Sequence, residues 1–154
     1  MAVLAKIVDV FSIFHDGTIV SWTGDRNQLR LTMSCSYLAE RFNSTYEFFF
    51  VELLNIDRLA FVPWMNPFEL EQEYFNEVGD IFKANLDILA AENDGDWAKI
   101  SCNQSDLAFD YCGGFLYIAG GDIRVFDQSG DEISIDRLAE VCRQYWDDFA
   151  SRGT

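Results

Sequence analysis

The stretch FKANLDILAAENDGDWAKISC, from Phe82 to Cys102, decides the fold class. Apolar residues recur at every second position from Phe82 to Ala90, which is the pattern of a β-strand with one buried face. The turn sequence Asn93-Asp94-Gly95-Asp96 follows and is typical of β-hairpins. The run from Trp97 to Cys102 is therefore predicted to be the returning strand of an antiparallel sheet.

The chain after this hairpin carries three more short runs that favour strands. They cover residues 107–111, 115–119 and 123–126, and they are separated by Gly113-Gly114 and Gly120-Gly121. Paired glycines are frequent in tight turns because glycine tolerates backbone angles that other residues avoid. We expect a meander of short strands with glycine turns.

The chain before the hairpin also contains runs that favour strands. Residues 18–22 and 29–35 alternate as strands around a turn at 24–27, so they are predicted to form a second hairpin. Residues 46–54 are dense in aromatic and branched side chains, as in a strand covered on both faces, and residues 56–64 are expected to form a neighbouring strand. Between residues 29–35 and 46–54, residues 37–42 break the alternation, which predicts a short helical or irregular connection.

Two segments carry helix signals. Asn66-Pro67 offers an N-cap and a first-turn proline, which predicts a short helix over residues 67–78 that Gly79 ends; the alternative is an acidic loop. Ser134 can cap a helix that runs to about Ser151, with apolar residues at helical spacing and Gly153 as its stop. Because an isolated helix of this length is marginal in water, it is expected to pack on the sheet.

These elements predict an α+β fold with a mainly antiparallel, meander-like β-sheet and a C-terminal amphipathic helix packed on it. The chain has 154 residues, of which 49% are hydrophobic and 16% aromatic, so it can bury one sizeable core. No repeat and no linker rich in Pro, Gly or Ser divides it. A single domain over residues 1–154 is expected.

Acidic residues dominate the charge of the chain. It has 26 Asp and Glu against 11 Lys and Arg, a formal net charge of −15, which excludes broad phosphate-driven binding of nucleic acid. Residues 66–154 carry 6 basic and 19 acidic side chains and hold most of this charge. Several acids stand at predicted turns and could converge on one end of the sheet, either as a solvated surface or as a surface that attracts a basic protein partner. The candidate partner-binding residues are Glu69, Glu71, Glu73, Glu77, Asp94, Asp96, Asp131 and Glu132.

Catalytic and cofactor motifs are missing from the sequence. The only histidine, His15, adjoins Asp16, but neighbours on a strand point to opposite faces, so this pair is expected to be a structural motif at the start of a strand. The four cysteines, at positions 35, 102, 112 and 142, are widely spaced and are interpreted as buried thiols. No glycine-rich phosphate loop and no metal-ligand spacing occurs. We therefore expect a non-enzymatic protein without metal or cofactor.

No run of about 20 apolar residues is present, as a membrane-spanning helix would need. The apolar N-terminal segment contains Lys6 and Asp9 and lacks the features of a secretion signal, so a cytoplasmic location is expected. The alternative function is a small-molecule or enzymatic pocket between sheet and helices, lined by Trp22, Trp64, Trp97 and Trp146 unless these pack in the core. The oligomeric state stays open.

One segment resembles a known family. Phe14-His15-Asp16-Gly17-Thr18-Ile19, followed by a polar turn and the alternating run from Leu29 to Met33, is similar to the opening of a family of small bacterial immunity proteins from polymorphic toxin systems. Ile56-Asp57-Arg58-Leu59 corresponds to a later apolar segment of that family. The resemblance covers about the first 60 residues. It implies a non-enzymatic protein that binds and neutralises a cognate toxin.

Overall fold

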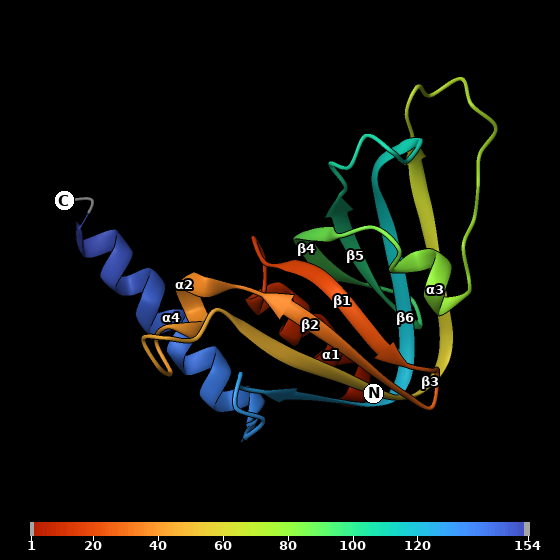
Figure 1. Ribbon diagram of the computed structural model, residues 1–154. Coiled ribbons are helices and arrows are strands. Elements are labelled where there is room, and N and C mark those ends of the chain that lie inside the picture. The colour runs from red at the N-terminus through yellow and green to blue at the C-terminus, as the bar shows by residue number, and fades with distance from the viewer. Residues whose placement is uncertain (1, 153–154) are drawn as a thin grey trace.

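The computed structural model describes residues 2–152 (Figure 1). Four helices and seven strands follow one another along the chain. In order, they are α1 (Ala2–Ile13), β1 (Thr18–Gly24), β2 (Gln28–Ser34), α2 (Ser36–Ala39), β3 (Phe48–Met65), α3 (Val78–Ile81), β4 (Leu86–Asp94), β5 (Trp97–Asn103), β6 (Tyr111–Phe126), β7 (Glu132–Ile133) and α4 (Ile135–Arg152). The sequence predicted both hairpins and the C-terminal helix.

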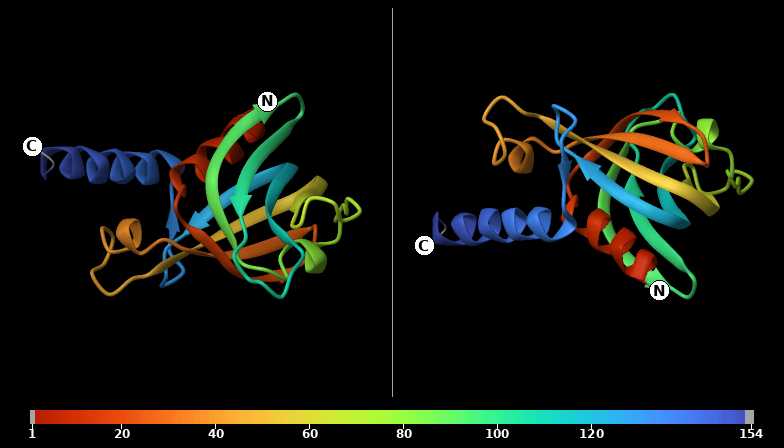
Figure 2. Two further views of the ribbon diagram at one scale, coloured as in Figure 1. Left: turned by 90° about the horizontal axis from the view of Figure 1, so that it is seen from above. Right: turned by 90° about the horizontal axis from the view of Figure 1, so that it is seen from below.

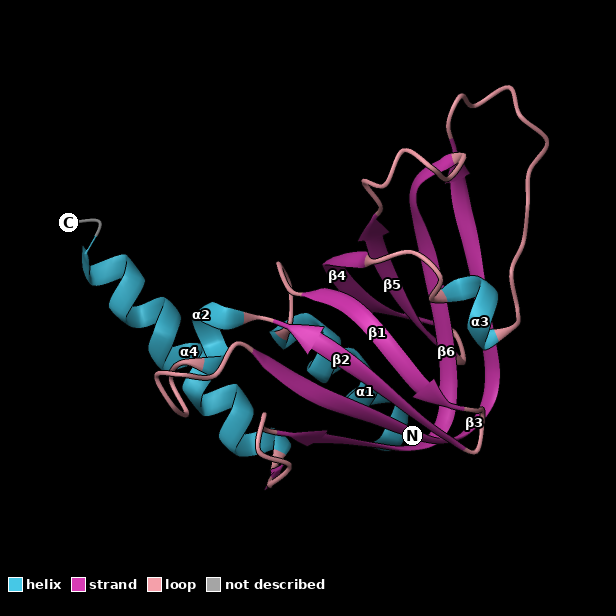
Figure 3. Cartoon of the chain, in the orientation of Figure 1, coloured by secondary structure: helices cyan, strands magenta, loops and turns pink. Residues whose placement is uncertain are grey.

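All seven strands belong to one antiparallel sheet that closes on itself. The strand order is β3-β2-β1-β4-β5-β6-β7, and β3 also pairs with β6, so six strands form a ring (Figure 2). The weakest junction lies between β1 and β4, where only Thr18 with Asp87 and Ile19 with Leu86 are paired. The α+β class with an antiparallel sheet is confirmed, and Figure 3 shows α1 behind the strands and α4 extending beyond them.

The prediction of three short strands after residue 107 is wrong, because residues 111–126 form the single long strand β6 and residues 107–110 lie in a loop. The two glycine pairs lie within β6 and not in turns. β6 pairs with β3 from Tyr111 to Phe126, and the two backbones approach closely. A Cβ atom at Gly114 would lie 2.6 Å from the carbonyl oxygen of Val62, so only glycine fits there.

The two strands predicted on either side of Asn55 are also one strand, β3. Asn55 has a φ of 50°, and a register shift lies between Ile56 and Arg58, so the strand bends there without ending. The inward side chains, such as Phe49 and Phe61, are buried, whereas Phe48 and Phe50 are half-buried on the outer face. The first half of β3 is thus not covered on both faces, contrary to the prediction.

Helix α1 was not predicted. Its side chains Ile7, Val10 and Phe11 are fully buried, as is Phe14 directly after it, and the helix packs against β4, β5 and β6. Figure 1 shows it behind β1 and β2. Its exposed polar residues Lys6, Asp9 and Ser12 recur every three positions, which is a one-sided helical pattern that was not used to predict a helix here.

The helix predicted over residues 67–78 does not form, and the acidic loop holds instead; the one-turn helix α3 begins only at Val78. Instead, backbone and side-chain groups of the loop form hydrogen bonds with the backbone of β3. Phe75 exchanges backbone hydrogen bonds with Phe61, and the Gln72 amide donates to the carbonyl oxygen of Pro63 over 2.8 Å. Contacts that satisfy the edge of a sheet outweigh the weak local helix signal.

Helix α4 matches its prediction closely. The Ser134 hydroxyl accepts a hydrogen bond from the backbone N–H of Arg137 over 3.1 Å, as an N-cap does. Leu138 and Val141 in its first half are buried, and its second half projects away from the strands (Figure 2). The expected stop at Gly153 lies outside the described residues. Among residues 2–152, no helix combines the length and the apolar character that a membrane crossing needs.

Candidate functional site

The outer surface of β5, β6 and the second half of β3 presents a row of aromatic side chains. Alternation along the strands decides which residues lie there, because inward neighbours such as Ile100 and Leu116 fill the core. We call this surface the aromatic face. It consists of Trp64, Trp97, Phe115 and Tyr117 together with Arg58, Ala60 and Lys99.

The four rings of the aromatic face touch one another in sequence. The ring centroids of Trp97 and Tyr117 lie 5.7 Å apart with the planes at 80°, and those of Trp64 and Phe115 lie 5.1 Å apart at 90°. Phe115 and Tyr117 connect the two pairs at 6.4 Å. Edge-to-face contacts of this kind are favourable and hold the rings in place. All four residues remain half-buried, so each ring keeps part of its surface accessible.

Two cations of the chain lie on these rings. The Arg58 guanidinium carbon is 5.6 Å from the centroid of Trp97, and the Lys99 ammonium is 4.2 Å from that of Phe115. Lys99 also lies 3.8 Å from a carboxylate oxygen of Glu92 on the neighbouring strand. The electron-rich ring faces therefore already attract positive charge.

A hollow of about 340 Å³ opens beside Trp97. It is lined by Ala60, Asp94, Trp97 and Tyr117. The lining residues form a row across four strands, since Asp94 is paired with Trp97 and Tyr117 with Ala60. Within residues 2–152, the Asp94 carboxylate, the Trp97 indole N–H and the Tyr117 hydroxyl make no hydrogen bond or ion pair. The hollow thus gathers three polar groups that are available to a ligand.

The acidic residues singled out in the sequence occupy three separate places and do not converge on one end of the sheet. Four of them, Glu69, Glu71, Glu73 and Glu77, lie in the loop between β3 and α3. Asp131 and Glu132 lie at the turn into β7, far from that loop in Figure 1. The third place is the tip of the β4–β5 hairpin, with Asp94 and Asp96. Only Asp94 lines the hollow; Asp96 lines another, of about 500 Å³, together with residues of α1.

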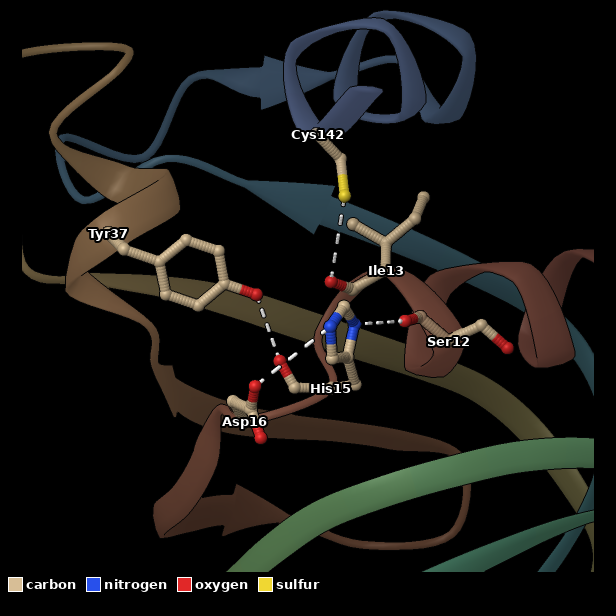
Figure 4. A network of polar contacts seen from close by, with 6 residues as sticks. All are labelled: Ser12, Ile13, His15, Asp16, Tyr37 and Cys142. Carbon is tan, nitrogen blue, oxygen red and sulfur yellow. Dashed lines mark hydrogen bonds and ion pairs between the residues drawn. The ribbon is translucent and has the colours of Figure 1, made fainter. Parts of the chain in front are cut away.

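His15 and Asp16 lie in the turn after α1 and not on a strand (Figure 4). The expectation that they point to opposite faces is therefore wrong: His15 Nε2 is 3.9 Å from Asp16 Oδ2. The other ring nitrogen, Nδ1, donates to the carbonyl oxygen of Ser12 over 3.0 Å, and the ring stacks on Trp146 with centroids 5.2 Å apart. The Tyr37 hydroxyl donates to the His15 carbonyl oxygen. These contacts join α1, α2 and α4, which is a structural role.

The thiols differ in exposure, which corrects the expectation that all four are buried. Cys35 and Cys102 are buried, Cys142 is partly buried and Cys112 is exposed. Burial raises the pKa of Cys35 to about 11, and burial also raises the pKa of Cys102. The thiolate is the reactive form, so these two side chains are poor nucleophiles near neutral pH. Within residues 2–152, no group of three or more potential ligands is placed to hold a metal ion.

The four tryptophans do not share one pocket, contrary to the alternative interpretation. Trp22 lines a hollow next to the β1–β2 turn, and Trp146 packs on His15. Trp64 and Trp97 lie on the aromatic face. Asp94 and Trp97 were candidate residues from the sequence alone, whereas Tyr117, Ala60 and Arg58 were not. The alternation in residues 115–119, with aromatic side chains at the outward positions, is the signal that could have identified Tyr117.

Comparison with known proteins identifies no relative: no family model, no curated protein and no solved structure matches this chain.

Proposed function

We propose that the chain is a non-enzymatic, cytoplasmic protein-binding domain and that its aromatic face binds a basic partner protein. The observation that carries the proposal is the row of accessible rings in which Trp97 and Tyr117 adjoin the unpaired carboxylate of Asp94. Trp, Tyr and Arg are the residues that most often dominate the free energy of protein–protein binding. They stand together here on a sheet whose strands hold them in fixed positions.

The face of the sheet suits a partner better than its edge does. The edge of β3 already pairs with Phe75, and Gln72 binds the Pro63 carbonyl, so a partner strand would find these groups occupied. The outer face offers ordered rings, which lose little conformational entropy when a partner covers them. Docking therefore takes place on the aromatic face.

Charge selects the class of partner. A net charge of −15 repels nucleic acid and attracts a basic protein over long distances. Glu92 and Asp94 lie at the end of β4, where they pair with Lys99 and Trp97 of the aromatic face. Carboxylates at the rim of an interface raise the association rate, whereas buried rings at its centre slow dissociation. The resemblance of the first 60 residues to immunity proteins implies that this partner is a toxin, which the chain neutralises.

The experiment first identifies the genes on either side of the gene of this chain. We expect one of them to encode a basic toxin, and the product of that gene is the partner used; the absence of such a gene would contradict the proposal. Calorimetry measures the affinity of this partner for the purified chain, and co-expression measures the rescue of growth. The double variant Trp97→Ala/Tyr117→Ala is expected to bind about 100-fold more weakly and to lose rescue, because two central aromatic contacts are removed.

Two matched variants test the position of the interface. Phe149→Ala removes an aromatic side chain that is 56% exposed on α4, and Glu71→Gln/Glu73→Gln removes charge from the acidic loop. Both are expected to bind within about threefold of the unmodified chain, as surface changes outside an interface do. Equal affinity of the double variant and the unmodified chain, or a neighbouring toxin that does not bind, would refute the proposal.

A further inference from the structure

We infer that the hollow between Asp94, Trp97, Tyr117 and Ala60 receives an arginine side chain of the partner. This inference rests on the proposed function and specifies the chemistry of its central contact. The hollow has the shape that a cation requires. Trp97 and Tyr117 meet at 80° and form a corner, and the small side chain of Ala60 leaves space next to the Tyr117 ring.

The polar groups around the hollow match a guanidinium. The Asp94 carboxylate can accept two parallel N–H hydrogen bonds, and the Tyr117 hydroxyl can accept another. Neither group has a partner within residues 2–152. A neutral ligand would leave the carboxylate without a counter-charge, whereas a cation supplies one and stacks on the rings.

The chain itself contains a filled version of this arrangement. On the outer face of β2, β3 and β6, the Arg30 guanidinium lies 4.5 Å from the Phe50 centroid and 5.3 Å from that of Phe126. It donates two hydrogen bonds, of 2.6 and 2.9 Å, to one oxygen of Glu52. At this site a guanidinium lies against two aromatic rings and forms an ion pair with one carboxylate. The hollow has two aromatic rings and a carboxylate but no guanidinium that pairs with this carboxylate within residues 2–152.

Arg58 of the chain itself does not supply the guanidinium that Asp94 lacks. Its guanidinium lies over Trp97 at 5.6 Å but forms no ion pair with Asp94 or with another carboxylate of the described residues. It shows that the Trp97 ring accepts a planar cation. Arginine is favoured over lysine because its planar, forked group can stack on a ring and bind a carboxylate through two N–H groups at once.

The test needs no partner protein. The probe is N-acetyl-arginine methylamide, and the matched control is N-acetyl-citrulline methylamide, which has nearly the same shape but no charge. Two-dimensional NMR follows the indole N–H signal of Trp97, assigned with Trp97→Phe. The arginine probe is expected to shift this signal saturably in the millimolar range, and the citrulline probe is expected to bind at least tenfold more weakly.

Variants separate the hollow from general attraction by the acidic surface. Asp94→Asn is expected to weaken the arginine probe at least fivefold, and Glu71→Gln is expected to leave it unchanged. Arg58→Met should strengthen binding two- to threefold by removing a like charge. Equal binding of both probes, or an Asp94→Asn variant that binds the arginine probe as well as the unmodified chain, overturns the inference.

The outcomes also distinguish this inference from the proposed function. If the partner binds through Trp97 and Tyr117 but the arginine probe does not bind, only the inference fails. If the probe binds and the neighbouring toxin does not, the hollow is a cation site and the proposed function fails. Asp94 is exposed and makes no side-chain hydrogen bond or ion pair with any of residues 2–152, so the Asp94→Asn variant is expected to fold normally, which the NMR spectrum checks.

Discussion

The two aromatic sites on the outside of the sheet contain the same kinds of group but differ in completeness. At the first, Arg30 binds Glu52 between two phenylalanine rings, and Glu52 is only 7% exposed. At the second, the Asp94 carboxylate is exposed and unpaired beside Trp97 and Tyr117. The first site is satisfied within the chain, whereas the second is open to an external ligand.

Strand register explains the difference. Arg30 lies directly opposite Glu52 on the neighbouring strand, which places the two charges in contact. Arg58 lies opposite Ala119, and Asp94 lies opposite Trp97 at the end of a hairpin, so no such pair can form. A satisfied ion pair contributes to the fold, whereas an exposed carboxylate without a partner adds little to its stability. Equivalent substitutions at the two sites should therefore have different effects.

The largest difference is expected from removing the guanidinium. Arg30→Met leaves the Glu52 carboxylate buried without its partner, which should lower the free energy of unfolding by about 2–3 kcal/mol. Arg58→Met leaves no buried charge unpaired and should change it by less than about 0.5 kcal/mol. Urea denaturation of both variants measures the two values. Equal losses would show that the two sites do not differ in the way described.

A smaller difference is expected from neutralising the carboxylate. Glu52→Gln keeps the shape of the side chain and one hydrogen-bond acceptor, so its cost should be about 1 kcal/mol. Asp94→Asn should cost less than about 0.5 kcal/mol because Asp94 has no partner to lose. The same denaturation experiment applies. A destabilised Asp94→Asn variant would mean that the open site is part of the structural framework.

The smallest effect on the fold should come from modifying Cys112. Its thiol is exposed and lies 3.6 Å from the carbonyl oxygen of Trp64, at one end of the aromatic face. Burial holds the pKa of Cys35 at about 11, so at pH 8 that thiol stays protonated and slow to react. Mass spectrometry should show Cys112 alkylated at least tenfold faster than Cys35, with no loss of structure. Faster reaction of Cys35 would contradict the described burial.

Local chemistry in the sequence explains which parts of the fold could be predicted. The Asp94-Gly95 turn and the alternation around it identify the β4–β5 hairpin, and Ser134 identifies the start of α4. The glycine pairs of β6 carry the same local signal as turns. At Gly114 and Gly121 the cause is instead the close approach of β3, about 50–70 residues earlier in the sequence. No local pattern contains that information.

The residues of the candidate site likewise fall into those that a local sequence pattern predicts and those that depend on long-range strand pairing. Asp94 and Trp97 belong to one hairpin, so their proximity follows from the turn. Tyr117 and Ala60 reach the hollow only because β6 pairs with β5 on one side and with β3 on the other. Half of the lining therefore depends on long-range pairing. The charge pattern indicated the acidic surface but not that one carboxylate among many adjoins two aromatic rings.

The pairing of β3 with β6 also has a consequence for the timing of folding. Phe50 contacts Phe126, and Ala60 contacts Tyr117, across long separations in sequence. Contacts of this kind form slowly because a long loop of chain must close first. During synthesis the ring cannot close until β6 has left the ribosome. A nascent chain can hold the β1–β2 hairpin early, but the aromatic face is complete only once β6 has been synthesised.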